Sequence, residues 1–414
     1  MPPGACQSGA LRRHDDGAPG TRCAAFAGRP RRLAASMAFA ASMLTGALDG
    51  ATSAPCLQPE QASWQTLYVE ISGGNRALHY YSTRLAGQTS DTATSALIAV
   101  HGYLHDANAT FAAAVQAAQA AGVLASTLVV APLFQVDPTE AAKHKPCTTQ
   151  GVPGPRPGDL TWTCGGWSDG AVADGPGGAL TAYAAMDRLL ARIVAMNPSV
   201  ATITVAGFSD GAQMVQHYAA LATPPAGRAV RFIVSDPGSW LYFDPNRPYP
   251  TVGGKPVPWS RCDHARNDGL GDCALSLLLP ANPPRGWSAP RACAAAGWQA
   301  QSNRWKYGTE HMPRTIGRSP DAMRQAYRSA EISYLLGRDD DRSGMGPSVF
   351  DTSCAAELEG SFRLQRGLGY AEYDRTKLNG TKHGVMVVHG CGHDVCCVFT
   401  STEARPALFP AEPR

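Results

Sequence analysis

The clearest chemical signal in the sequence is a pentad at positions 207–211, Gly-Phe-Ser-Asp-Gly, which matches the pattern G-x-S-x-G. An apolar run over 202–206 precedes it, and a helical run begins at its last glycine. A strand, such a pentad and a helix form a turn that lifts a serine hydroxyl above a sheet, because the glycines permit a strained and closely packed backbone. The next N–H heads the helix, where it can stabilise an oxyanion. The pentad therefore predicts Ser209 as a nucleophile and the Asp210 N–H as an oxyanion donor.

A serine nucleophile of this kind needs a carboxylate and a histidine later in the chain, in that order and each after a strand. The β-rich run 331–336 leads to three consecutive aspartates at 339–341, and the run 384–388 leads to His393 between glycine-rich residues. A histidine there can remove the serine proton, while a carboxylate holds its other ring nitrogen. We therefore expect His393 to be the base and one of the three aspartates to be the acid, with the other two solvated.

A second oxyanion donor is expected in the loop that follows the strand before the first long helix. The sequence there reads Val-His-Gly-Tyr-Leu over 100–104, so the expected donor is the backbone N–H of Tyr103. His101 in this loop is interpreted as structural rather than catalytic. This chemistry needs no metal ion and no organic cofactor.

The elements that must position these residues alternate between short β-rich runs and longer helical ones. Continuous Val, Ile, Leu and Ala runs are typical of parallel strands covered by helices on both faces. The expected strands are 66–71, 78–83, 96–100, 127–132, 202–206, 230–235, 331–336 and 384–388, and the expected helices are 108–121, 179–196, 211–221, 319–330 and 353–374. This alternation predicts the α/β class, with a doubly wound, mostly parallel sheet of eight strands.

Two long stretches, 137–177 and 237–318, interrupt the alternation and are rich in Gly, Pro, Trp and Cys. Both follow strands, where open α/β sheets bind their ligands, and long loops in compact folds are often functional. We expect these insertions to form a disulfide-rich lid; the alternative is that they only decorate the fold. Their tryptophans Trp162, Trp167 and Trp240 are the expected cleft wall, although tryptophan packs a lid equally well.

The N-terminal segment has the order of a signal peptide. Three arginines within 29–32 precede a small, apolar run over 33–48, and small residues follow. The apolar run is shorter than the roughly 20 residues of a bilayer span, so no stable membrane anchor is expected; the alternative is a buried helix. We interpret 1–54 as a leader, with 1–28 either part of it or upstream of the true start, and 55–414 as one domain with two insertions.

Composition limits the remaining classes. The 414 residues are 44% hydrophobic and 17% charged, with a net charge of +3, which excludes a disordered chain and argues against nucleic acid as a partner. Twelve cysteines without paired zinc-ligand spacing indicate an oxidising compartment, so the protein is expected to be secreted or periplasmic. Two local bridges are plausible, Cys147 with Cys164 and Cys262 with Cys273.

These motifs together resemble the α/β-hydrolase superfamily, and the chain is similar, more narrowly, to a group of secreted or periplasmic hydrolases of bacteria and fungi. The narrower resemblance covers residues 95–401 and is carried by Trp167-Ser-Asp-Gly170, Val205-Ala-Gly-Phe-Ser-Asp-Gly-Ala-Gln213, Tyr242-Phe-Asp-Pro245, Trp305-Lys-Tyr-Gly308, Tyr334-Leu-Leu-Gly-Arg-Asp-Asp340, Thr352-Ser-Cys-Ala-Ala356, Arg363-Leu-Gln-Arg-Gly367 and His389-Gly-Cys-Gly-His-Asp394. It implies an α/β-hydrolase fold and a serine hydrolase acting on small or polymeric carboxylic esters, and it implies Asp340 as the acid.

The sequence departs from the usual form of that group at several positions. Asp210 stands where relatives often carry Ala, and its carboxylate beside the nucleophile would disfavour an anionic intermediate or substrate. Asp236 replaces a more usual Asn and is an alternative acid. The cysteines Cys391, Cys396 and Cys397 lie unusually close to the catalytic histidine in the sequence. Either a bridge from one of them holds the catalytic loop, or they are ordinary buried cysteines.

Two interpretations from different classes follow. The preferred one is a secreted serine hydrolase that cleaves carboxylic esters, with polyester depolymerase or amidase and peptidase activity on the same triad as alternatives. The rival is an inactive scaffold of the same fold that serves as an exported binding protein. The intact order of Ser209, Asp340 and His393 favours the enzyme.

Overall fold

The computed structural model describes residues 56–57, 63–71, 74–84, 92–143, 147, 151–174, 180–262, 269–295, 297–341 and 350–410. The predicted leader over 1–54 lies outside these residues. Among the helices of the described segments, none combines the length and the apolar character needed to cross a membrane.

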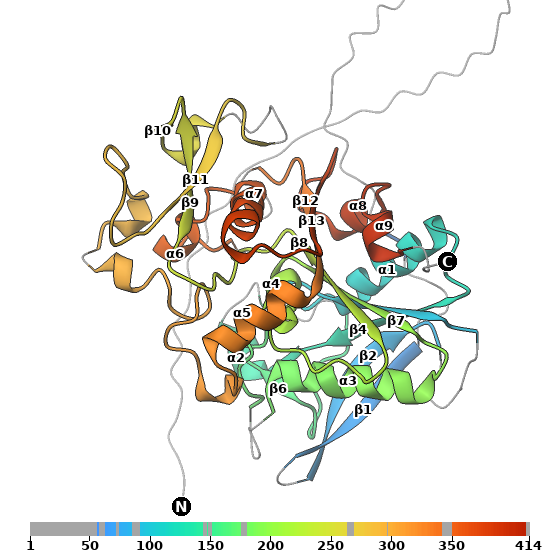
Figure 1. The fold of residues 1–414 in the computed structure, drawn as a ribbon. Helices are drawn as coiled ribbons and strands as arrows, with labels where there is room; N and C mark the ends of the chain where they lie inside the picture. Colours follow the sequence, from blue (N-terminus) through green and yellow to red (C-terminus); the bar gives the residue numbers. More distant parts are fainter. Residues whose placement is uncertain are drawn as a thin grey trace, which may run out of the picture. The chain divides into compact units, whose positions relative to one another are not determined.

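A single sheet of eight strands runs through the centre of the fold (Figure 1), in the order β1-β2-β4-β3-β7-β8-β12-β13. All pairs from β4 to β13 are parallel, whereas β2 is antiparallel to both of its neighbours. The strands are β1 (Ser63–Ile71), β2 (Gly74–Ser82), β3 (Ser95–Val100), β4 (Thr127–Leu133), β7 (Thr202–Phe208), β8 (Ala229–Ser235), β12 (Glu331–Gly337) and β13 (His383–Val388). The predicted doubly wound, mostly parallel sheet of the α/β-hydrolase fold is confirmed.

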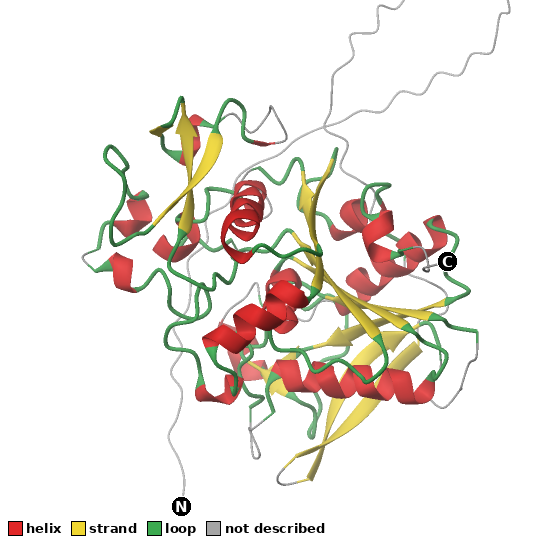
Figure 2. Ribbon diagram, viewed as in Figure 1, coloured by secondary structure: helices red, strands yellow, loops and turns green. Residues whose placement is uncertain are grey.

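Helices cover both faces of this sheet (Figure 2), because alternate strand residues point to opposite sides. Ile98 of β3 belongs to the core under α3, α4, α5 and α7, whereas its neighbours Leu97 and Ala99 belong to the core under α1, α8 and α9. The helices are α1 (Ala107–Ala120), α2 (Pro138–Lys143), α3 (Ala182–Met196), α4 (Asp210–Ala219), α5 (Pro320–Ser329), α6 (Cys354–Glu357), α7 (Arg363–Tyr373), α8 (Val395–Thr400) and α9 (Arg405–Leu408).

The strand order brings four predicted site segments to one edge of the sheet. Parallel strands end at the same edge, and β3, β7, β8, β12 and β13 are consecutive neighbours. The loops after β3, β7, β12 and β13 carry Tyr103, Ser209, Asp340 and His393 respectively. Ligands of open α/β sheets bind outside this carboxyl edge, so the topology alone places these residues on a common surface.

The predicted helix over 353–374 is wrong in its continuity. The structure has α6 and α7 instead, with an interruption at Gly360, whose φ of +147° favours glycine. A side chain there would also crowd the backbone nitrogen of Arg366, at 2.9 Å from an added Cβ. The helical pattern of the sequence continued across a residue whose backbone does not fit a helix.

Each insertion contains short strands that the sequence pattern did not reveal. In the first, β6 (Thr161–Trp162) pairs with β5 (Gln135–Val136), which directly precedes the insertion. In the second, β9 (Arg247–Val252) lies between β10 (Lys255–Pro256) and β11 (Ala274–Leu278) in a small antiparallel sheet. Three prolines lie in β9 and β10, which is a composition that argues against a strand.

The ten cysteines from Cys56 onward form five disulfides. They pair Cys56 with Cys396, Cys147 with Cys164, Cys262 with Cys273, Cys293 with Cys354, and Cys391 with Cys397. Both expected local bridges are confirmed, and of the two alternatives for the cysteines near His393 the bridged one holds. Each of the five bridges has at least one cysteine in an insertion or within six residues of His393.

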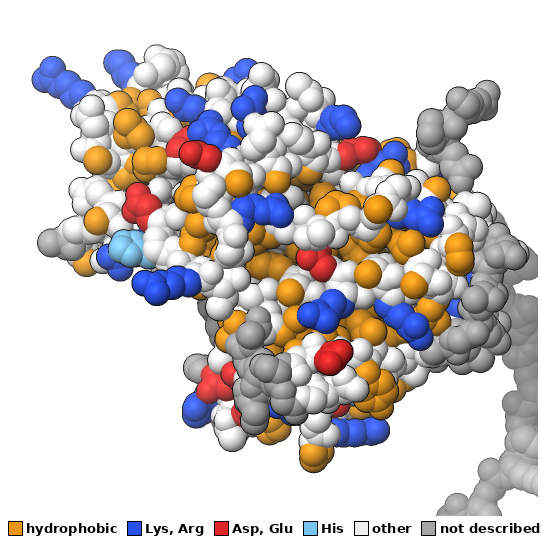
Figure 3. Space-filling view, turned by 60° about the horizontal axis from the view of Figure 1, so that its bottom comes forward, with side chains coloured by type: hydrophobic (Ala, Val, Ile, Leu, Met, Phe, Trp, Pro, Cys, Tyr) orange, Lys and Arg blue, Asp and Glu red, His pale blue; other side chains and the backbone are white. Residues whose placement is uncertain are grey.

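The face seen in Figure 3 carries Lys and Arg side chains dispersed among acidic and apolar ones. Large hydrophobic side chains that remain exposed in the described segments are likewise scattered, at Leu57, Tyr68, Leu104, Leu279 and Val385. Such isolated apolar residues are normal on a soluble surface. Leu104 is the one among them that lies at the carboxyl edge of the sheet, beside Ser209.

Candidate active site

Ser209 sits on a sharp turn between the end of β7 and the start of α4. Its backbone has φ of +59° and ψ of −123°, a strained conformation for a residue with a side chain. A methyl group on Gly207 would overlap the carbonyl of Gly211, and one on Gly211 would overlap the carbonyls of Val100 and His101. Both glycines of the pentad are thus required by close backbone contacts, as the sequence pattern predicts.

The side chains of Ser209, His393 and Asp340 lie in one hydrogen-bonded line. The Ser209 Oγ is 2.9 Å from His393 Nε2, and His393 Nδ1 is 2.6 Å from Asp340 Oδ2. The ring of His393 also stacks on Phe208, with 4.7 Å between ring centroids. The structure therefore brings together three residues whose separation in the sequence reaches 184 positions.

Asp340 is the carboxylate that faces His393, and its position is fixed from several sides. Its Oδ1 lies 3.6 Å from a guanidinium nitrogen of Arg363, and the backbone N–H of Leu364 donates to its carbonyl. Asp339 is exposed, as expected for a solvated neighbour. The same expectation is wrong for Asp341, whose side chain is buried and only 6% exposed.

Asp236, the alternative acid, lies at the end of β8 and is fully buried. Its two carboxyl oxygens accept the backbone N–H of Gly337 at 2.9 and 3.1 Å, rather than a nitrogen of His393. Burial, reinforced by the nearby charge of Asp340, raises its pKa well above the usual range of a carboxyl group. A neutral carboxyl group is a poor partner for an imidazolium. Neither the contacts nor the raised pKa of Asp236 therefore favour it as the acid.

The loop after β3 packs directly against the nucleophile. A Cβ added to Gly102 would lie 3.3 Å from the Ser209 Cβ and 3.8 Å from its Oγ. The fully buried His101 holds this loop, since its Nδ1 donates to the Gly102 carbonyl at 2.8 Å and its Nε2 accepts the Phe134 N–H at 3.0 Å. Burial, together with the charge of His105, lowers the pKa of His101 to about 3, so it acts as a neutral, structural residue.

The two expected oxyanion donors flank Ser209. Asp210 is the first residue of α4, so its N–H has no acceptor within the helix and lies at the positive end of the helix dipole. Tyr103 follows Gly102 in the adjacent loop and lines both hollows that border Ser209. Their positions beside Ser209 agree with the expected oxyanion donors, which remain a prediction.

Burial affects the protonation of two groups beside Ser209. It lowers the pKa of His393 below its ordinary value of 6.5, although the charge of Asp340 opposes this shift. It raises the pKa of Asp210 to about 7, against the opposing charge of Lys306 and with a reinforcing charge from Asp169. His393 is therefore a neutral base near pH 7, and Asp210 changes from neutral to charged in that same range.

These two shifts predict a bell-shaped pH dependence of kcat/KM. The rate should rise through a pKa below 6.5, as His393 loses its proton and becomes a base, and fall above about 7, as Asp210 ionises beside the oxyanion. A unit charge 4 Å away at an effective dielectric of 20 is worth about 4 kcal/mol. Because the charge of Lys306 offsets part of this repulsion between Asp210 and the oxyanion, we expect kcat/KM to fall only about tenfold by pH 9.

The control for this pH profile is Asp210→Asn, which keeps the backbone N–H and the side-chain shape. The other groups that act on the Asp210 carboxyl, namely Ser168, Asp169, Lys306 and Asp351, remain in this variant. Its rate should rise with the wild type at low pH and then stay level to pH 9. An alkaline fall that is the same in both proteins would contradict this role of Asp210.

Two hollows meet at Ser209, and we name them by their residues. The histidine-side cleft has a volume of about 200 Å³ and is lined by Gly102, Tyr103, Leu104, Asp106, Thr110, Phe208, Ser209, His393, Asp394 and Val395. The polar cleft has a volume of about 230 Å³ and is lined by Tyr103, Gly165, Ser209, Asp210, Gln213, Gly238, Lys306, Phe350, Asp351 and Arg363. Of the charged residues of the polar cleft, Asp210 was predicted as a site residue, whereas Lys306, Asp351 and Arg363 were not. Lys306 and Arg363 do lie in motifs of the family resemblance.

The three tryptophans predicted as a cleft wall do not line either cleft. Trp162, Trp167 and Trp240 are all 0% exposed and belong to the main hydrophobic core. Trp167 stacks on Phe134, and Trp240 stacks on Tyr370 with 4.4 Å between ring centroids. This prediction is wrong because the rings bury more apolar area under the insertions than they could at the cleft surface.

The loop that carries His393 is closed by the disulfide between Cys391 and Cys397. The Cys391 carbonyl accepts the backbone N–H of Asp339, which joins this loop to the segment of the acid at 2.9 Å. The adjacent Cys396 bonds to Cys56, so α8 is held by a second bridge. The two disulfides thus hold the His393 loop and α8, and the hydrogen bond from Asp339 fixes this loop against the segment of Asp340.

Removal of the loop disulfide by Cys391→Ser with Cys397→Ser is expected to lower kcat about tenfold with little change in KM, because the histidine is no longer held in line. The stability should fall by about 2 kcal/mol, the loop-entropy value for so short a loop. The matched control is Cys262→Ser with Cys273→Ser, a bridge of similar span in the second insertion. It should lose similar stability and keep kcat; equal kcat in both double variants would contradict a role for the loop bridge.

Comparisons with known proteins concern the fold. No protein-family model and no curated protein matches the sequence. Among solved structures, similar ones include a poly(aspartic acid) hydrolase of Sphingomonas sp. KT-1, at 16% identity over 83% of this chain and 96% of that one with a TM-score of 0.49. A poly(3-hydroxybutyrate) depolymerase of Bordetella parapertussis is similar at 16% identity over 81% of this chain and 86% of that one, with a TM-score of 0.47. A siderophore hydrolase of Aspergillus nidulans is similar at 13% identity over 88% of this chain and 99% of that one, with a TM-score of 0.41.

Proposed function

We propose that this protein is a secreted serine hydrolase that cleaves carboxylic esters through an acyl-enzyme intermediate. The observation that carries the proposal is the line of contacts from Ser209 Oγ through His393 to Asp340, at 2.9 and 2.6 Å. A hydroxyl, an imidazole and a carboxylate in this geometry form the group that activates a serine for attack on an acyl carbon.

In the first half of the reaction, His393 Nε2 takes the hydroxyl proton while Ser209 Oγ attacks the ester carbonyl carbon. The backbone N–H groups of Asp210 and Tyr103 hold the oxyanion, and Asp340 stabilises the imidazolium. His393 then gives its proton to the alcohol oxygen, which leaves. In the second half, a water molecule loses a proton to His393 and attacks the acyl carbon. His393 then returns this proton to Ser209 Oγ as the bond from Oγ to the acyl carbon breaks, which releases the carboxylic acid and restores the hydroxyl.

Secretion forms part of the proposal and is supported by the cysteines. Five disulfides join all ten cysteines from Cys56 onward, and disulfides persist in oxidising compartments. The predicted signal peptide within 1–54 agrees with export. A signal cleavage product that begins between residues 45 and 60, identified by N-terminal sequencing of protein collected outside the cytoplasm, would support this part of the proposal; cytoplasmic, unprocessed protein would contradict it.

A substrate panel tests the reaction class. Wild-type protein is incubated with p-nitrophenyl esters of increasing chain length, an insoluble polyester and a peptide p-nitroanilide, and Ser209→Ala serves as the blank. We expect turnover of the esters and little of the amide, because p-nitrophenoxide is a better leaving group than p-nitroaniline. Faster release from the polyester would place the protein among depolymerases, and faster amide cleavage among peptidases. Turnover of none of the three would favour the rival interpretation, an inactive binding scaffold.

A further inference from the structure

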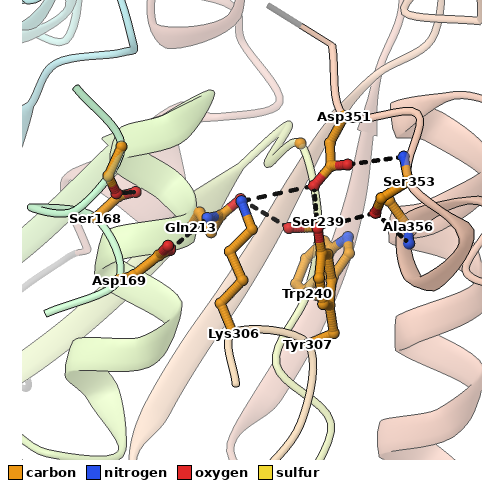
Figure 4. A network of polar contacts seen from close by, with 12 residues as sticks. Ser168, Asp169, Gln213, Ser239, Trp240, Lys306, Tyr307, Asp351, Ser353 and Ala356 are labelled. Carbon is orange, nitrogen blue, oxygen red and sulfur yellow. Dashed lines mark hydrogen bonds and ion pairs between the residues drawn. The ribbon is translucent and has the colours of Figure 1, made fainter. Parts of the chain in front are cut away.

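The polar cleft contains one ammonium group beside the nucleophile. Lys306 lines this cleft together with Ser209 and Asp210, and its side chain is 24% exposed. Figure 4 shows the ammonium end of Lys306 between Gln213 and Asp351, at the centre of a polar network. A lysine whose stem is buried and whose head faces a cleft is not an ordinary surface lysine.

The backbone around Lys306 is held on both sides, so its side chain starts from a fixed point. The indole N–H of Trp305 donates to the Asp169 carbonyl at 3.0 Å, which joins the second insertion to the first. The Nε2 of His217, on α4, lies 3.0 Å from the Lys306 carbonyl. The lysine therefore has a defined place relative to α4, the helix that begins beside Ser209.

The ammonium of Lys306 has donors to spare, whereas the nearby acids Asp169 and Asp351 are engaged. Within the described segments, its ion pair is to Asp351, at 3.5 Å, and an ammonium has three donors. Asp351 also accepts the Tyr307 hydroxyl at 2.6 Å and the Ser353 N–H at 3.0 Å, and Asp169 accepts the Gln213 amide at 3.0 Å. Asp210, a third acid of this cleft, has one carboxyl oxygen without a hydrogen-bond partner among the described residues, but this carboxyl is neutral below its pKa of about 7. At lower pH a ligand in the cleft is therefore the stronger source of a further acceptor for Lys306.

The chemistry of the triad assigns the two clefts to the two halves of an ester. His393 must protonate the leaving alcohol, so the alcohol part lies in the histidine-side cleft, which His393 lines. The acyl part extends to the other side of Ser209, into the polar cleft with Lys306. The carboxylates of Asp169 and Asp351 offset the charge of Lys306. Arg363, the second cation that lines this cleft, pairs with Asp340. This balance of charge favours a neutral acceptor over an anionic one.

We propose that Lys306 is a specificity-determining residue that donates a hydrogen bond to a neutral oxygen in the acyl chain of the substrate. The substrate class is then esters of oxygen-bearing carboxylic acids, such as ether, oxo or hydroxy acids, in preference to plain alkanoic acids. This inference rests on the proposed ester hydrolase function and deepens it. A plain alkyl chain would displace solvent from Lys306 without replacing its hydrogen bonds, so it binds less well.

The test compares esters that differ by one CH₂-to-oxygen exchange. The pairs are p-nitrophenyl pentanoate with 3-methoxypropanoate and p-nitrophenyl hexanoate with 4-methoxybutanoate, each measured as kcat/KM. In the wild type, the ether ester of at least one pair should be preferred about tenfold, beyond the ratio of the two uncatalysed hydrolysis rates. Lys306→Met, which keeps the length of the side chain without charge or donors, should lower kcat/KM for the ether ester more than for the alkyl ester, so that the preference is lost.

Several controls keep the test decisive. Lys143→Met removes an exposed lysine of α2 that pairs with Glu140, and it should keep the preference. The charge of Lys306 lowers the pKa of Asp210, so the Lys306→Met variant should have a higher Asp210 pKa than the wild type. Rates are therefore compared at pH 6, where Asp210 is protonated in both the wild type and the variant. If Lys306→Met does not fold, Lys306→Gln takes its place. It keeps a neutral hydrogen-bond donor and should retain part of the preference for the ether ester.

The outcomes separate this inference from the proposed function. A wild type that hydrolyses both esters of each pair without preference, or a Lys306→Met variant that keeps the preference, would overturn the role of Lys306 and leave the hydrolase intact. A wild-type preference for p-nitrophenyl hydrogen glutarate over the ether esters would overturn the neutral acceptor. Absence of turnover for every ester would instead overturn the proposed function itself.

Discussion

Replacing Ser209 by alanine is expected to lower kcat for ester hydrolysis by about 10⁶, because no other hydroxyl is aligned with His393 Nε2 in the described part of the chain. The alanine fits the turn no worse than serine does, since both have a Cβ at the same positive φ. The folded structure should therefore survive, and near-ultraviolet circular dichroism and the melting temperature should stay at the wild-type values. Burst and steady-state release of p-nitrophenol measure the loss.

The matched control for this prediction is Ser235→Ala. Ser235 ends the neighbouring strand β8 and is fully buried, and its hydroxyl has no hydrogen-bond partner among the described residues. Its removal should leave kcat within about twofold of the wild type, since surrounding interactions change little. A Ser209→Ala protein that keeps more than about a hundredth of the wild-type rate would place the nucleophile elsewhere.

Asp340→Asn is expected to lower kcat by about 10⁴ at neutral pH, the size of this effect in the well-studied serine protease triad. The amide of asparagine has the shape of the carboxylate but no negative charge. It can accept or donate one hydrogen bond to the neutral ring of His393, but it cannot also stabilise the imidazolium. The hydrogen bond at 2.6 Å to His393 Nδ1 is the contact that changes. KM should change far less than kcat, because Asp340 is 3% exposed and does not line either cleft.

Two asparagine variants at neighbouring acids control for this result. Asp339→Asn alters the exposed carboxylate that directly precedes Asp340 in the sequence, and it should leave kcat unchanged. Asp236→Asn alters the buried acid whose carboxyl accepts the Gly337 N–H, and an amide oxygen can still accept this bond. A near-normal rate in Asp340→Asn, with a large loss in Asp236→Asn, would move the acid to the end of β8.

The sheet and the triad could be predicted from the sequence because both depend on local patterns. Buried parallel strands are continuous apolar runs, and each of the eight expected runs became a strand of the sheet. The order of Ser209, the aspartates and His393 follows from the order of the strands that carry them. The choice of Asp340 among three adjacent aspartates came from the family resemblance, since neither charge nor spacing distinguishes them.

The insertions could not be predicted to the same depth, because their residues find partners far away in the sequence. Tryptophan is suited both to a cleft and to a core, and no periodic pattern around Trp162 or Trp167 indicated which way the rings point. The proline-rich strand β9 pairs through its position in a small sheet rather than through strand propensity. Lys306 gained its place through its own contact with His217, 89 residues earlier, and through the contact of its neighbour Trp305 with Asp169, 136 residues before that tryptophan.

The central claim, that Ser209 is a nucleophile activated by His393, is tested most directly by covalent labelling with a fluorophosphonate probe. The full-length folded protein is incubated with the probe near pH 7, digested, and examined by mass spectrometry. We predict one labelled site, Ser209, with labelling lost in Ser209→Ala and strongly slowed in His393→Ala. A wild-type protein that takes up no label, or a label on another residue that persists in Ser209→Ala, would contradict the account.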